Sequence, residues 1–173
     1  MVTAGPRVWL RASRGQGVDV ATVLRLTNDL LSRDLEGRFV TCFLGLLDPE
    51  RSTLTYASAG HGPLVFYDRS KDEFAQYPAT ALPLGIVPDS LESEIATHRF
   101  AGGDFAAITT DGIFEAEDRK GEPFGVPRMM EILRRDRDLP AKQMIRNLHD
   151  SVTEFCAGAP QADDLTAVVI RKV

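Results

Sequence analysis

The chain has 173 residues, of which 25 are acidic and 20 basic, so its formal net charge at pH 7 is −5. Its length and its 43% hydrophobic content suit one soluble domain with a hydrophobic core. The acidic balance and the lack of clustered Lys and Arg argue against a nucleic-acid-binding surface, and no apolar run resembles a membrane span or a signal peptide. We therefore expect a single cytoplasmic domain over residues 1–173 that binds neither nucleic acid nor a membrane.

The first predicted element is an amphipathic helix over residues 19–36. Its apolar residues recur at helical spacing. Asp19 can cap the start of this helix, and Gly37 can end it. A shorter helix is also expected before Gly15.

After this helix the pattern changes to short runs rich in β-branched and aromatic residues. Turn-forming residues separate these runs, and the short connections favour antiparallel pairing over parallel crossovers. We expect strands at residues 39–47, 53–58, 64–68, 92–100 and 105–110.

Two helices and a last strand complete the chain. One helix is expected from about residue 126 to residue 137, and the next begins with Pro140 in its first turn. The last strand, residues 165–171, is apolar enough to be central in a sheet. This order predicts an α+β domain with antiparallel sheet and helices packed on its faces. Cys42 and Cys156 both have apolar neighbours and are expected to be free, buried thiols.

Aspartates stand at the ends of two of these strands. Asp111-Gly112 follows the strand at 105–110, and Asp163-Asp164 opens the last strand. If the two strands are antiparallel, these carboxylates meet at one edge of the sheet. Neighbouring carboxylates repel each other unless a cation lies between them, and carboxylate oxygens suit Mg²⁺ or Mn²⁺. Gly112 would let the backbone turn tightly there.

A simpler interpretation of the same residues stays open. An Asp-Gly pair by itself is typical of a turn, and Asp163-Asp164 by itself is typical of a solvated loop. The two together, beside apolar strands in this order, favour the metal site. Sequence spacing alone does not decide between the two interpretations.

Five short segments then stand out in series between about residues 24 and 170. They are AGHGP at 59–63, LPLG at 82–85, TDGIFEA at 110–116, GEPFG at 121–125 and ADDLT at 162–166. In order and spacing they resemble the motifs of PPM/PP2C-type serine/threonine phosphatases of the SpoIIE and RsbU class. The resemblance implies a PP2C-like antiparallel β-sandwich flanked by helices, with two Mn²⁺ or Mg²⁺ ions at one edge. It also implies hydrolysis of a phosphoserine on a regulatory protein, similar to an anti-anti-sigma factor, in bacterial signalling.

The resemblance also assigns roles to individual residues. Asp111 and Asp163 match the two motif aspartates, so they would be metal ligands and catalytic residues. His61 would contact the substrate. Three further residues would not bind the metal but would hold the ligand residues in position: Gly112, Asp164 and Thr166, the last through its hydroxyl group.

One part of the family pattern has no match in this sequence. Members of the class begin with strands that carry two further acidic motifs, one of which supplies the aspartate that bridges both metals. The resemblance therefore implies a domain that is incomplete at its N-terminus, with residues 1–36 similar to a helical segment that switches the metal site on. Two functions follow as alternatives: a metal-dependent phosphatase, or a catalytically inactive phosphatase-like domain for interaction or regulation. Unpaired strand edges would also favour self-association, for example as a homodimer.

Overall fold

The computed structural model describes residues 19–35, 37–87 and 92–173. The expected short helix before Gly15, and residues 1–18 of the expected switch segment, lie outside the described residues. The chain forms two compact units. None of the described helices is long and apolar enough to cross a membrane.

The first unit contains α1 (Val20–Asp34) and a three-stranded sheet in the order β1-β2-β5. The carboxylate of Asp19 accepts hydrogen bonds from the backbone N–H groups of Ala21 and Thr22 at 3.2 and 3.1 Å, which confirms the predicted cap. Buried apolar side chains of α1 pack with those of β2 and with Leu84. The strands are β1 (Cys42–Asp48), β2 (Thr53–Ala59) and β5 (Ala96–Arg99).

The second unit contains a four-stranded antiparallel sheet in the order β4-β3-β6-β7. Its register is fixed by pairs such as Val65↔Ala107 and Thr109↔Ala167. All residues of β3 and β6 are buried except Asp68 of β3, as expected for central strands. The strands are β3 (Leu64–Asp68), β4 (Glu73–Tyr77), β6 (Phe105–Thr109) and β7 (Ala167–Arg171).

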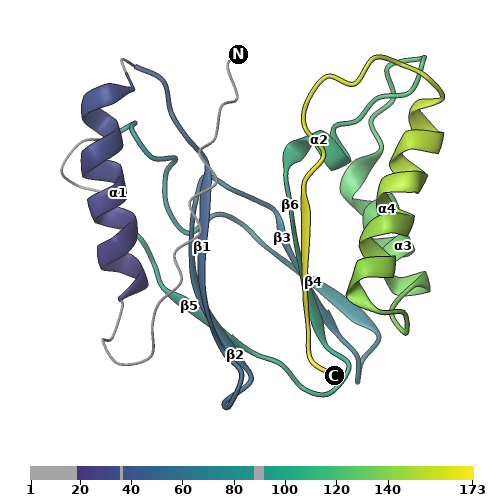
Figure 1. The fold of residues 1–173 in the computed structure, drawn as a ribbon, viewed down its shortest axis with the longest axis horizontal. Helices are drawn as coiled ribbons and strands as arrows, with labels where there is room; N and C mark the ends of the chain where they lie inside the picture. The colour runs from purple at the N-terminus through teal and green to yellow at the C-terminus, as the bar shows by residue number, and fades with distance from the viewer. Residues whose placement is uncertain (1–18, 36, 88–91) are drawn as a thin grey trace. The chain divides into compact units, whose positions relative to one another are not determined.

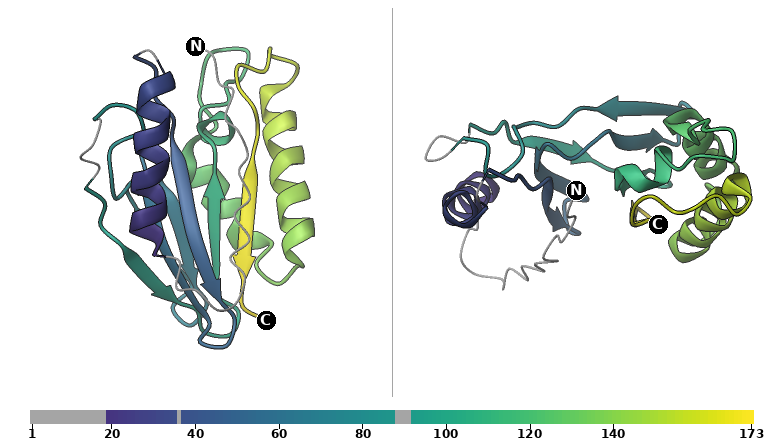
Figure 2. Two further views of the ribbon diagram at one scale, coloured as in Figure 1. Left: turned by 60° about the vertical axis from the view of Figure 1, so that its left-hand side comes forward. Right: turned by 90° about the horizontal axis from the view of Figure 1, so that it is seen from above.

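The second unit also contains α2 (Asp111–Phe114), α3 (Gly125–Arg135) and α4 (Ala141–Cys156). Figures 1 and 2 show α3 and α4 side by side, with α4 running along β7. Their fully buried side chains pack on Phe105 and Ala107 of β6, and each such burial stabilises the unit by about 1.5–3 kcal/mol. The helical core residues are Met129, Leu133, Met144, Leu148 and Val152.

The predicted α+β class and the antiparallel pairing of β6 with β7 are confirmed. Both cysteines are free, as expected, but each is half-buried and not fully buried as predicted. The expected central position of the last strand is wrong, because β7 is an edge strand of the described sheet. Its apolar run reflects the packing of Val169 against the core, whereas Val168 on its other face is 41% exposed.

Candidate functional site

The edge of the sheet where β6 ends and β7 begins carries both acidic motifs. Because β6 and β7 are antiparallel, with Thr109 opposite Ala167, the end of one strand lies beside the start of the other. Asp111 is the first residue of α2, directly after β6, and Asp163 lies in the loop that leads into β7. The convergence that the strand order predicts is therefore present in the backbone (Figure 1).

The side chain of Thr110 joins the two acidic segments. Its hydroxyl donates a hydrogen bond to the carbonyl oxygen of Asp164 at 2.9 Å and accepts one from the backbone N–H of Thr166 at 3.0 Å. The backbone N–H of Thr110 also donates to the carbonyl oxygen of Thr166 at 3.0 Å. Three hydrogen bonds thus hold the start of α2 against the loop before β7.

Sequence reasoning missed this role of Thr110. Thr110 is the first residue of the TDG motif, and its place in that motif was the one sequence feature that could have indicated the bridging role. The prediction gave the orienting hydroxyl to Thr166, whereas Thr166 takes part in this bridge through its backbone N–H and carbonyl groups. Any role of the Thr166 hydroxyl stays a prediction.

Gly112 is required here for close approach of two backbones. It is buried in α2 and does not have a positive φ, so its backbone conformation does not itself require glycine. A Cβ atom at this position would lie 2.6 Å from the carbonyl oxygen of Asp164, which is closer than real Cβ contacts. The absence of a side chain therefore lets the Asp164 loop lie directly against α2.

The two carboxylates are held in similar ways. One oxygen of Asp111 accepts a hydrogen bond from the N–H of Gly112 at 3.0 Å, and one oxygen of Asp163 accepts from the N–H of Asp164 at 2.7 Å. The side-chain amide of Gln161 donates to the carbonyl oxygen of Asp163 at 2.8 Å. These contacts orient both acidic groups at one edge, where a cation would offset their mutual repulsion.

The donor set fits a hard divalent cation in type but is small in number. Carboxylate oxygens are the ligands that Mg²⁺ and Mn²⁺ prefer, and Mg²⁺ takes six oxygen ligands. Within the described ranges, no group of three or more His, Cys, Asp or Glu side chains could hold a metal ion. Asp111 and Asp163 could therefore supply part of a metal site, and the remaining ligands would have to come from other groups.

His61 belongs to the first unit, whereas both aspartates belong to the second. Within the first unit, the segments AGHGP and LPLG lie side by side. The N–H of Gly60 donates to the carbonyl oxygen of Ala81 at 2.8 Å, and the carbonyl oxygen of Ser58 accepts from the N–H of Ala81 at 2.9 Å. The hydroxyl of Ser58 donates to the carbonyl oxygen of His61, which shapes the turn that carries the imidazole. The role of His61 toward the substrate stays a prediction.

Solved structures with the same fold define the class of this domain. The SiaA-PP2C domain of Pseudomonas aeruginosa matches 88% of this chain and 61% of its own, with a TM-score of 0.74 at 21% identity. The PP2C phosphatase domain of the cell fate determinant SpoIIE from Bacillus subtilis, solved with a fragment of its regulatory domain, matches 90% of this chain and 45% of its own, with a TM-score of 0.70 at 24% identity. The fold is therefore that of the PP2C-type phosphatase domains.

The sequence comparisons give the family. The model of the Stage II sporulation protein E (SpoIIE) family matches residues 1–173, and the chain belongs to this family. The phosphoserine phosphatase RsbU of Bacillus subtilis is 26% identical over 157 residues, and the protein IcfG of Synechocystis is 29% identical over 158 residues. Both alignments cover 90% of this chain, which spans 46% of RsbU and 24% of IcfG.

Proposed function

We propose that this domain is a metal-dependent protein serine/threonine phosphatase that acts on a phosphoserine of a regulatory protein in bacterial signalling. The observation that carries the proposal is the hydrogen-bonded bridge that brings the segments of Asp111 and Asp163 to one edge of the sheet. The similarity to a phosphoserine phosphatase supports phosphoserine as the substrate group. The motif series favours a partner similar to an anti-anti-sigma factor.

In this proposal the residues of the acidic edge hold the metal ion or keep its ligands in place. Mn²⁺ or Mg²⁺, when bound, supplies Lewis-acid activation of water for attack on phosphorus. Asp111 and Asp163 would hold the ion, and Thr110 and Gly112 keep the two acidic segments in register. His61 would contact the substrate.

Replacing Asp111 tests this proposal. We expect Asp111→Asn in the whole protein to lower Mn²⁺-dependent hydrolysis of p-nitrophenyl phosphate and of a phosphoserine peptide by at least about 100-fold, because a neutral amide holds a divalent cation weakly. Asp150→Asn is the matched control, since Asp150 is an 81% exposed carboxylate on α4, and it should keep wild-type activity. Full activity in Asp111→Asn would overturn the proposed role of this carboxylate.

The alternative function, an inactive phosphatase-like domain for interaction or regulation, is favoured by one observation. Asp111 and Asp163 are not accompanied by a third ligating side chain among the residues that the structure describes. If the wild-type protein shows no turnover with Mn²⁺ or Mg²⁺ while circular dichroism shows an intact fold, this alternative is the correct one. Turnover that depends on Asp111 excludes it.

A further inference from the structure

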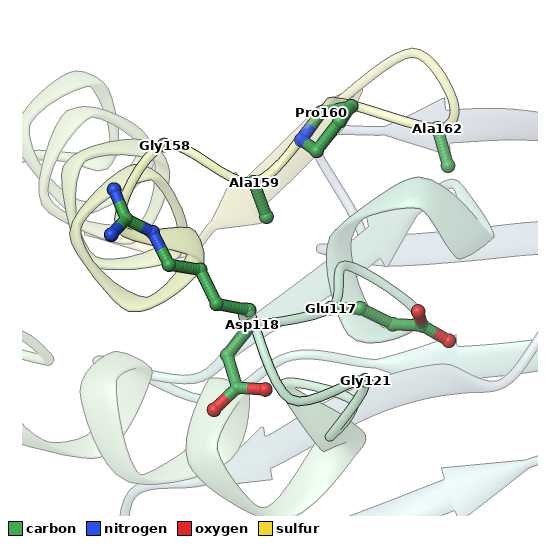
Figure 3. Close-up of a pocket in the computed structure, with 8 residues that line it drawn as sticks. Glu117, Asp118, Gly121, Gly158, Ala159, Pro160 and Ala162 are labelled. Atoms are coloured by element: carbon green, nitrogen blue, oxygen red, sulfur yellow. The ribbon is translucent and has the colours of Figure 1, made fainter.

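A pocket of about 410 Å³ lies beside the acidic edge, entirely within the second unit. One wall is the loop between α2 and α3, and the other is the loop between α4 and β7 (Figure 3). The second loop continues from Ala162, which lines the pocket, directly into Asp163. The lining residues are Glu117, Asp118, Arg119, Gly121, Gly158, Ala159, Pro160 and Ala162.

The first wall is held in shape by its own hydrogen bonds. One carboxylate oxygen of Asp118 accepts from the N–H groups of Lys120 and Glu122 at 2.7 and 3.0 Å, and these bonds lower the pKa of Asp118 below its usual value. The N–H of Phe124 donates to the carbonyl oxygen of Ala116 at 2.7 Å, which closes the base of the loop. The pocket is therefore built before any ligand enters.

Arg119 is the one cation among the residues that line this pocket, and Glu117 is an exposed carboxylate in the same lining. The Arg119 guanidinium makes no hydrogen bond or ion pair within the described part of the chain, and a Cβ atom at Gly158 would lie 3.4 Å from its Nη2 atom. One oxygen of the Asp118 carboxylate already accepts hydrogen bonds from two backbone N–H groups. The exposed side chain of Arg119 thus comes close to Gly158, on the wall that also carries Ala159 and Pro160.

We propose that this pocket binds the polypeptide segment next to the phosphoserine of the substrate, with Arg119 pairing with an acidic side chain of that segment. The proposal rests on the proposed phosphatase function. A guanidinium binds a carboxylate through two parallel hydrogen bonds, and small apolar side chains such as Ala159 and Pro160 suit the body of a peptide. Arg119 and Pro160 are exposed, so an extended chain could pass through the pocket and continue on both sides.

The position of the pocket predicts where the acidic residue lies in the substrate. The pocket begins at Ala162, one residue from the proposed ligand Asp163. An extended peptide advances about 3.3–3.6 Å per residue. We therefore expect the recognised Asp or Glu within a few residues of the phosphoserine.

A charge swap tests the pocket. The probes are two phosphoserine peptides that differ only in carrying Glu or Lys at the second to fourth positions on either side of the phosphoserine. For the wild-type protein we expect kcat/KM to favour the acidic peptide, and for Arg119→Glu we expect this preference to fall by at least about tenfold, chiefly through KM. Arg146→Glu, the same charge change at an exposed position on α4, should keep the wild-type preference.

The outcomes separate this proposal from the proposed function. The proposed role of the pocket is overturned if Arg119→Glu keeps the preference for the acidic peptide. It is also overturned if kcat/KM falls equally for both peptides. If the wild-type protein hydrolyses neither peptide, the phosphatase function fails, and the pocket is then judged by fluorescence anisotropy with the labelled acidic peptide. Binding that weakens by about tenfold in Arg119→Glu but not in Arg146→Glu supports the pocket, and binding that is absent or equal in both overturns it.

Discussion

The hydroxyl group of Thr110 makes two of the hydrogen bonds between α2 and the loop before β7. Thr110→Val keeps the shape of the side chain but removes both bonds, so we expect a loss of about 1–3 kcal/mol in the free energy of unfolding. Urea denaturation measures this loss, and calorimetry with Mn²⁺ should show weaker metal binding. Thr153→Val is the control, because the Thr153 hydroxyl bonds only within α4, to the carbonyl oxygen of His149. Equal stability of the two variants would contradict the bridging role.

Gly112 gives a second prediction at the scale of a single residue. Gly112→Ala places a methyl group 2.6 Å from the carbonyl oxygen of Asp164, so we expect the loop to shift and stability to fall by about 1–3 kcal/mol. Helix propensity alone would act in the opposite direction, by about 1 kcal/mol in favour of Ala. Thermal denaturation and Mn²⁺ titration measure the effect. Gly102→Ala is the control, since a Cβ there would meet nothing within 4 Å, and a stable, metal-binding Gly112→Ala protein would refute the argument.

Helices α3 and α4 are joined by the buried carboxylate of Asp136, the residue that caps the end of α3. It accepts hydrogen bonds from the Arg135 guanidinium at 2.8 and 3.1 Å and from the side-chain amide of Asn147 on α4 at 2.7 Å. The Arg135 guanidinium, with help from Asn147, holds the pKa of Asp136 below its ordinary value of 3.8.

A carboxyl group with a lowered folded-state pKa stabilises the fold above its unfolded pKa. The contribution of Asp136 should therefore be complete above about pH 4 and should be lost as the pH falls through its lower folded-state value. We expect Asp136→Asn to cost about 1.5–3 kcal/mol at pH 7 and less than that at pH 2, measured by urea denaturation at both values. A cost that does not change with pH would show that the charge of Asp136 does not stabilise the helix pair.

The elements that could be predicted from the sequence are those with a strong local pattern. The cap at Asp19 and the buried strands β3 and β6 follow from side-chain types and periodicity. Strand β4 was not predicted, because four of its five residues are exposed and its pattern resembles a polar loop. The short helix α2 was also not predicted. Asp111-Gly112 is typical of a turn, and a helix of four residues is too short to show helical periodicity.

The candidate site, like the fold, could be predicted from the sequence only in part. The convergence of the two acidic segments follows from the order and direction of two strands. The bridge made by Thr110 could not be predicted, because its partners lie 54 and 56 positions away and a hydroxyl group leaves no periodic signal. The reason for Gly112 also needed the structure, since it depends on a carbonyl oxygen from the other acidic motif.

At the scale of the whole molecule, strand β7 is an edge of the described sheet that favours association. Strand β7 pairs with β6 alone in the described sheet, and Val168 on β7 is 41% exposed. Edge strands of this kind pair readily with another chain, so we expect a homodimer. Val168→Lys should shift the protein toward monomer in size-exclusion chromatography with light scattering. Val173→Lys, at a fully exposed residue, should not, and a wild-type monomer at high concentration would refute the expectation.

The contact between Gly60 and Pro83 has a consequence for anyone who builds chimaeras from such domains. Gly60 has a φ of +64°, and a Cβ atom there would lie 2.4 Å from Cγ of Pro83, so the proline ring occupies the place of a side chain. The turn that carries Gly60 and the turn that carries Pro83 therefore have complementary shapes at this contact. A swap that imports the histidine-bearing turn from a homologue should bring its proline-bearing turn along, because neither segment has the right shape without its native counterpart.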